Sequence, residues 1–114
     1  MQAAPKKVVI GDRDAIVLAL VSHILKREGY VTHPVDDREE LLRVLQAGEF
    51  DAAVVDALLD GVIDVVKTVP ARTRIIVTSP HDHHDGIGVH ATLRKPLEFG
   101  LLIDTVRDCV AQGE

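Results

Sequence analysis

The stretch "KKVVIGDRD" (residues 6–14) joins an apolar run to a charged turn. Residues 8–10 are three consecutive β-branched side chains without a polar residue between them, as in a parallel strand buried on both faces. Asp12 and Asp14 follow this run directly, with Arg13 between them. The stretch therefore predicts a parallel sheet whose first strand carries acidic side chains to its carboxyl end.

Short β-branched runs alternate with longer stretches whose apolar residues recur at helical spacing and are expected to face the core. In the first and last of these stretches the apolar residues are Val17, Leu20, Val21, Ile24, Leu25, Phe99, Leu102, Ile103, Val106 and Val110. The predicted strands cover residues 6–11, 30–35, 51–56, 74–79 and 89–94, and the predicted helices cover residues 14–28, 36–49, 61–69 and 97–112. Pro34 indicates that the second strand lies at an edge of the sheet, because proline cannot donate to a central ladder. Asp36, with Glu39 three residues later, predicts the start of the second helix.

This alternation predicts an α/β fold, because right-handed crossovers place helices on both faces of a parallel sheet. Five strands in a chain of this size favour a doubly wound, flavodoxin-like sheet of order 2-1-3-4-5. Residues 80–88 have no helical apolar face, so the helix expected between the fourth and fifth strands, the fourth of this fold, should be shortened or missing. Residues 1–114 are expected to form a single domain.

The composition excludes several classes of protein. Apolar residues make up 46% of the chain but aromatic residues only 3%, which predicts an aliphatic core. A net charge of −5 argues against nucleic-acid binding, and no apolar run approaches the ~20 residues that span a bilayer. The single cysteine, Cys109, cannot form an internal disulfide, in keeping with a cytoplasmic protein.

Four polar side chains follow or end different strands of the predicted sheet. Asp12 follows the first strand, Asp56 ends the third, Thr78 lies at the end of the fourth and Lys95 follows the fifth. Such a group suits phosphoryl transfer to the Asp56 carboxylate, with hydroxyl and ammonium groups meeting the phosphoryl oxygens. Carboxylates after the first strand would hold a divalent metal ion.

With these residues in this order, the chain resembles the receiver domain of bacterial two-component response regulators. The resemblance spans about residues 6–110 and rests on Asp12, "FDAAVVD" (50–56), "DG" (60–61), "VTS" (77–79) and "KP" (95–96). It implies that Asp56 is the phosphoacceptor, Thr78 the switch hydroxyl and Lys95 the pocket lysine. It also implies Mg²⁺ as cofactor, a cis peptide between Lys95 and Pro96, and a histidine kinase or phosphotransfer protein as phosphodonor.

The chain departs from the receiver pattern in four places. Arg13 stands where the second metal-binding acid is expected, so that Asp12 and Asp14 are the remaining metal candidates. The segment between Asp56 and its Asp-Gly is shorter than usual, and so is the segment between Thr78 and Lys95. Thr92 replaces the aromatic switch residue. One hypothesis is that the Arg13 guanidinium folds over the pocket and replaces the metal charge.

The segment "HDHHDG" (81–86) holds side chains of types that bind zinc or nickel, namely His81, His83 and His84. These histidines lack the i, i+4 spacing of a helical site and have no cysteine beside them. Only adventitious metal binding is expected there.

Two functions of different kinds remain from the sequence. The first is a stand-alone or excised receiver domain in a phosphorelay, a phosphoprotein that signals to a downstream protein partner without being an enzyme in the ordinary sense. The alternative is a degenerate receiver, a protein-binding module that works without phosphorylation. A flavin-binding protein is disfavoured, because "GDRDA" (11–15) places two carboxylates where a phosphate would lie.

Overall fold

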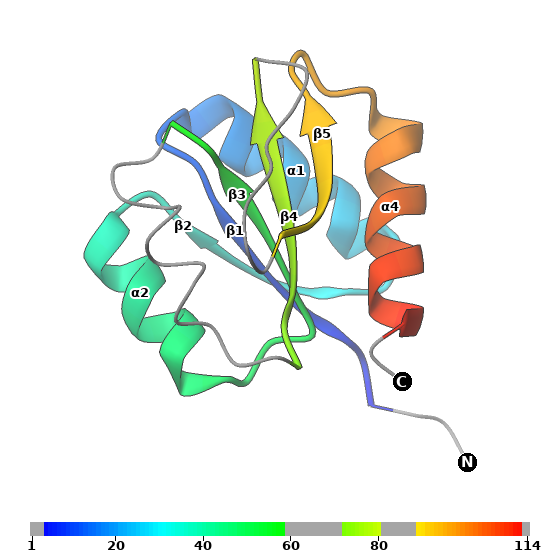
Figure 1. Ribbon diagram of the computed structural model, residues 1–114. Helices are drawn as coiled ribbons and strands as arrows, with labels where there is room; N and C mark the ends of the chain where they lie inside the picture. Colours follow the sequence, from blue (N-terminus) through cyan, green and yellow to red (C-terminus); the bar gives the residue numbers. More distant parts are fainter. Residues whose placement is uncertain (1–3, 59–71, 81–88, 113–114) are drawn as a thin grey trace.

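The computed structural model describes residues 4–58, 72–80 and 89–112. Five parallel strands form one sheet in the order β2-β1-β3-β4-β5, as predicted (Figure 1). The strands are β1 (Lys7–Gly11), β2 (Val31–Val35), β3 (Ala52–Asp56), β4 (Arg74–Ser79) and β5 (Val89–Arg94), and the described helices are α1 (Ala15–Arg27), α2 (Arg38–Ala47) and α4 (Phe99–Gln112). Strand β2, which contains Pro34, is an edge strand as expected.

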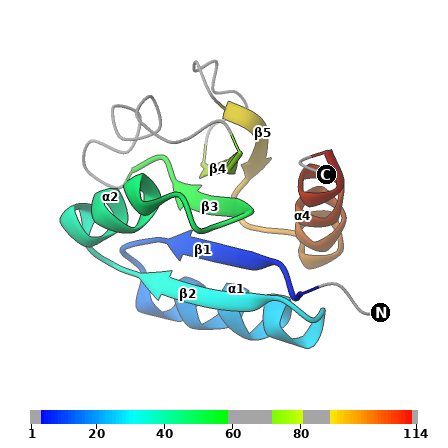
Figure 2. The ribbon, with the colours of Figure 1, turned by 90° about the horizontal axis from the view of Figure 1, so that it is seen from below.

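The helices cover both faces of the sheet. Figure 2 shows α2 and α4 on opposite sides of the sheet, and α1 belongs to the α4 side, because residues of both helices lie in one core cluster. Alternate residues of a strand point to opposite faces, so Val9 joins the α2 side and Val8 the α1–α4 side. Aliphatic side chains fill both cores, with Leu41 and Leu45 of α2 on one side and Leu102 and Val106 of α4 among those on the other, and these four are at most 1% exposed.

Aspartate side chains cap the N-termini of α1 and α2. The Asp14 side chain accepts hydrogen bonds from the backbone of the first turn of α1. The predicted cap of the second helix was one residue too early: Asp37, not Asp36, accepts a bond of 3.2 Å from Glu40 N. The same acid-x-x-Glu spacing occurs at both positions, so the spacing alone could not separate them. Gly29 ends the first helical segment at φ 96°, a left-handed conformation that favours glycine.

Two apolar side chains predicted to face the core are largely exposed. Leu20 of α1 is 44% exposed and Phe99 of α4 is 41% exposed. Both line an apolar cavity between α1 and the chain that runs from β5 into α4. Helical periodicity predicts the buried side of a helix, but not how far its neighbour extends.

Two predicted features fall outside the part of the chain that the structure describes. The short helix at 61–69 lies within the undescribed range 59–71. The helix between β4 and β5, expected to be shortened or missing, falls on residues 80–88, of which 81–88 are not described. Within the described ranges, none of the helices is long and apolar enough to cross a membrane.

Two neighbouring leucines of α4 test the core on the α1–α4 side. Leu102 is fully buried and Leu101 is 52% exposed. We expect Leu102→Ala to lower the free energy of unfolding by about 3 kcal/mol, because it removes buried methyl groups and leaves a cavity. Leu101→Ala should change it by less than about 0.5 kcal/mol. Urea denaturation of both variants measures the difference, and equal losses would contradict this packing.

Candidate functional site

The polar residues singled out in the sequence come together where β1, β3, β4 and β5 end, at the edge towards which the β4 and β5 arrows point in Figure 1. Asp12 follows β1, Asp56 is the last residue of β3, and Thr78 lies opposite Asp56 in the register of β4. These three residues are no more than 4% exposed. Buried polar groups require partners, so their contacts define the site.

Lys95 supplies the positive charge between the two buried carboxylates. Its Nζ lies 2.9 Å from Asp12 Oδ2 and 3.5 Å from Asp56 Oδ2. One backbone contact positions it, because the Lys95 N–H donates to Ser79 O at 2.7 Å. The Lys95–Pro96 peptide bond is cis. One ammonium group therefore joins the ends of β1, β3 and β5.

Backbone N–H groups hold the other oxygen of each carboxylate. Asp12 Oδ1 accepts from Asp14 N at 2.8 Å, and Asp56 Oδ1 accepts from Leu58 N at 3.1 Å. Each carboxylate thus has one oxygen against a backbone donor and one against the Lys95 ammonium. This arrangement fixes the orientation of Asp56 and leaves its Oδ2 beside a cation.

The Thr78 hydroxyl is only weakly held. Its Oγ1 lies 3.5 Å from Val55 O, the outer limit of a hydrogen bond. The Thr78 backbone carbonyl accepts from Ala57 N at 2.8 Å, which ties the residue after Asp56 to β4. The Thr78 backbone is therefore held by a hydrogen bond of 2.8 Å, whereas rotation of its hydroxyl breaks only one weak contact.

Arg13 does not provide the pocket's cation in this structure, contrary to the hypothesis that its guanidinium pairs with the pocket acids. Arg13 is exposed, and within residues 4–58, 72–80 and 89–112 it forms no ion pair with Asp12 or Asp56. Lys95 already satisfies both carboxylates. Asp14 acts as the helix cap, with its Oδ1 2.9 Å from Ile16 N.

Asp12 and Asp56 are the described carboxylates that could approach the Mg²⁺ ion that the resemblance implies, whereas Asp14 caps α1. No group of three or more acid, histidine or cysteine side chains able to hold a metal ion occurs among the described residues. A divalent cation beside Asp12 and Asp56 would also meet the like charge of Lys95. His81, His83 and His84 lie outside the described residues.

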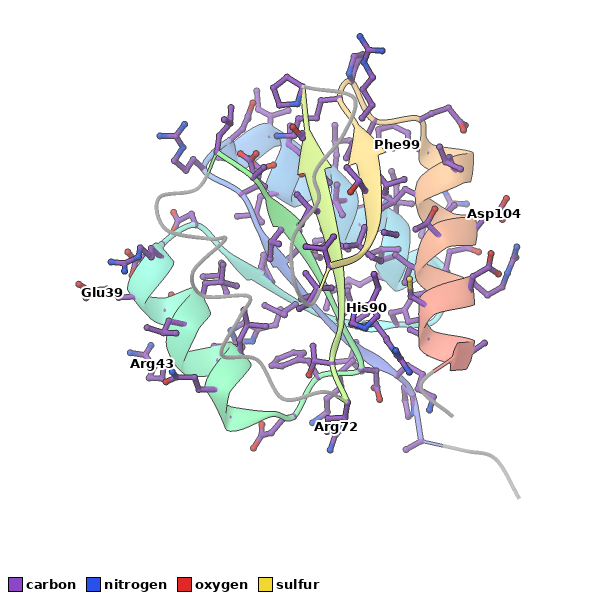
Figure 3. All side chains as sticks on the ribbon, viewed as in Figure 1. Glu39, Arg43, Arg72, His90, Phe99 and Asp104 are labelled. Atoms are coloured by element: carbon purple, nitrogen blue, oxygen red, sulfur yellow. The ribbon has the colours of Figure 1, made fainter. Side chains whose placement is uncertain are left out.

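An apolar cavity of about 210 Å³ opens beside this site. Its lining residues come from α1 and from the segment between β5 and α4: Val17, Leu20, Val21, Lys95, Pro96, Leu97 and Phe99. Figure 3 labels Phe99 at the start of α4. Sequence reasoning missed this cavity because it assigned Leu20 and Phe99 to the core. Lys95 belongs to both the cavity wall and the charged site.

Comparisons with known proteins place this geometry in a family of folds. No protein-family model matches the sequence, and no curated protein matches it. Solved structures do match. The receiver domain protein (CheY-like) of Methanospirillum hungatei has a TM-score of 0.84 at 20% identity, over 96% of this chain and 97% of that one.

Two further structures give the same result. The chemotaxis response regulator CheY4 of Vibrio cholerae has a TM-score of 0.84 at 23% identity, over 93% of this chain and 99% of that one. The receiver domain from the hybrid histidine kinase CckA has a TM-score of 0.76 at 18% identity, over 91% of this chain and 98% of that one. The chain therefore has the fold of response regulator receiver domains, in a divergent sequence.

The charge balance of the site can be tested by removing Lys95. Lys95→Met should lower the free energy of unfolding by about 3 kcal/mol, because it leaves two buried carboxylates without their cation. Lys26→Met, at an exposed lysine of α1, is the matched control and should cost less than about 0.5 kcal/mol. Urea denaturation at neutral pH measures both.

A second variant separates charge from packing. Adding Asp12→Asn to Lys95→Met should restore part of the loss, since one buried negative charge is then removed. If the double variant is no more stable than Lys95→Met, the ion pair does not account for the stability of the site.

Proposed function

We propose that residues 1–114 form a single receiver-like domain of a phosphorelay, in which Asp56 accepts a phosphoryl group. The observation that carries the proposal is the arrangement of Asp56 Oδ2 beside the Lys95 ammonium, with Thr78 opposite Asp56 in the neighbouring strand. Solved proteins with this fold include a receiver domain of a hybrid histidine kinase. The proposed location is the cytoplasm.

The proposed reaction uses groups that the pocket already holds. The free lone pair of Asp56 Oδ2 attacks phosphorus, the bond from phosphorus to the donor nitrogen or oxygen breaks, and the donor leaves with that electron pair. Lys95 stays close enough to offset the charge of the arriving phosphoryl oxygens. The Thr78 hydroxyl gives up its weak contact with Val55 O and donates to one of those oxygens.

The proposed donor is a histidine kinase or a histidine phosphotransfer protein. Because Asp56 is 4% exposed, such a donor must sit closely over the strand ends. The apolar cavity with Leu20 and Phe99 offers a docking surface there, and Lys95 connects it to Asp56. An apolar helix face of the donor is the occupant that we propose for it.

A degenerate receiver that binds its partner without phosphorylation is the second candidate function. Arg13 at an acid position of the receiver pattern favours it, and so does the Lys95 ammonium between Asp12 and Asp56, where a divalent cation would meet a like charge. The two candidates differ in one measurable property, which is whether Asp56 can be phosphorylated.

Incubation with acetyl phosphate tests the first candidate. The intact protein should gain the mass of one phosphoryl group, measured by mass spectrometry, because acetyl phosphate is small enough to reach Asp56. Asp56→Asn should abolish the gain. The control is Asp51→Asn, since Asp51 lies at the opposite end of β3, where it accepts from Lys7 N at 2.8 Å. Its gain should match the wild type.

The same reaction decides for or against the second candidate. It is run with Mg²⁺ and with a chelator, and Lys95 as the resident cation predicts similar gains in both. No gain at saturating donor, restored by Arg13→Asp with Mg²⁺, would contradict the phosphoacceptor proposal and support the binding module.

A variant of the cavity rim tests the proposed donor surface. Leu20→Asp should slow transfer from a phosphorylated histidine phosphotransfer domain about tenfold or more, because it places a charge in the apolar contact. Phosphorylation by acetyl phosphate should not change. Val31→Asp, at a 47% exposed position of β2, is the control. Equal slowing by both variants would show that the cavity is not the docking surface.

A further inference from the structure

Strand β5 does not pair evenly with β4. Ile75 lies opposite Val89, while the next residue, Ile76, lies opposite Ala91. Between these two pairs, β5 advances by two residues while β4 advances by one. His90 is therefore the extra residue of a β-bulge. Figure 3 labels this residue at the start of β5.

The His90 side chain takes the place of a strand carbonyl at this bulge. Backbone N–H groups of a strand point alternately to its two neighbours, and Arg74 N donates to Asp51 O on the β3 side at 3.0 Å. The next N–H, that of Ile75, therefore faces β5. It donates to His90 Nδ1 at 2.9 Å.

A backbone N–H can donate only to an unprotonated ring nitrogen. His90 must therefore be neutral in this structure, with its proton on Nε2. His90 is an exposed residue of an edge strand. Partial burial of its ring, and after it the Arg74 guanidinium, lowers the pKa of His90 below the ordinary value for histidine. This direction agrees with the hydrogen bond, because both favour the neutral ring.

The charged and titratable groups around His90 come from β4 and α4. Among the described residues, Arg74 of β4 is the charged group that acts on the ring. Helix α4 packs against β5 and contributes Cys109, a buried thiol whose pKa is raised first of all by burial. Asp108 of α4 acts on Cys109, but Arg74 is the charged group that acts on His90, so protonation of the ring places two cations near each other.

We propose that His90 is a proton-sensitive latch that holds the start of β5 against β4. When the ring takes up a proton, Nδ1 becomes a donor, the bond from Ile75 N is lost, and two N–H groups face each other. The start of β5 then separates from β4. The far end stays in place, because Lys95 N donates to Ser79 O.

The direction of the pH effect follows from the neutral ring. A histidine whose pKa is lowered by folding stabilises the fold at a pH above its ordinary value of about 6.5. That contribution is lost as the pH falls below this value, because the unfolded chain then takes up the proton more readily. Acid therefore opens this end of the sheet.

Two NMR measurements test the latch on ¹⁵N-labelled wild-type protein. At about pH 7.5, a scalar coupling should connect the Ile75 amide nitrogen with His90 Nδ1, and it should vanish once the His90 ring is protonated. The hydrogen-exchange protection factor of Ile75 should fall about fivefold or more over the same titration, as expected for loss of one hydrogen bond.

Three substitutions separate the latch from other effects of pH. His90→Asn keeps an acceptor oxygen at the position of Nδ1 but does not titrate, so Ile75 should be equally protected at both pH values. His90→Leu should leave Ile75 poorly protected at both. His33→Asn is the control. His33 lies on the other edge strand, β2, with its Nε2 3.8 Å from Glu40 Oε1, so this variant should retain the wild-type response at Ile75.

Three results would contradict the proposed latch. A His90 ring that is protonated on Nδ1 at neutral pH would overturn the proposal. So would an Ile75 protection factor that does not change while His90 titrates, or one that changes equally in His90→Asn.

Discussion

The compensation of two buried carboxylates by one ammonium group is the constraint on which the functional end of this sheet depends. Asp12 and Asp56 lie at the ends of two central strands, where almost no water reaches them. Lys95 must therefore lie between them, although it is distant from both in sequence. Its placement requires β5 to pair beside β4 and the chain to turn sharply after it, so the charge balance and the sheet order support each other.

The strand order could be predicted because its causes are local and repeated. Each strand is a short β-branched run, and parallel pairing with right-handed crossovers leaves few ways to arrange five of them. The meeting of Asp12, Asp56, Thr78 and Lys95 followed from the same rule, since parallel strands end at one edge. The direction of the Arg13 side chain did not follow. Adjacency in sequence does not determine which cation forms an ion pair with a carboxylate. Asp12 pairs with Lys95 of a distant segment and not with the neighbouring Arg13.

Other features depend on contacts that no local pattern contains. The periodicity of α1 and α4 correctly assigned Val21, Leu25 and Val106 to the core, but it could not show that a cavity lies beside Leu20 and Phe99. The β-bulge arises from how two strands meet.

Strand β5 shows why such features concentrate at the edge of a sheet. A central strand is held by ladders on both sides, whereas β5 pairs with β4 alone among the residues that the structure describes. Side chains and turns must then secure it, and here they do so at both ends: the His90 ring accepts from β4 at the start, and Lys95 is anchored to Ser79 and to the buried acids at the finish. Either anchor can be weakened by a change of charge, a proton on the first or a phosphoryl group beside the second. An edge strand that side-chain charges secure at both ends is therefore open to chemical control.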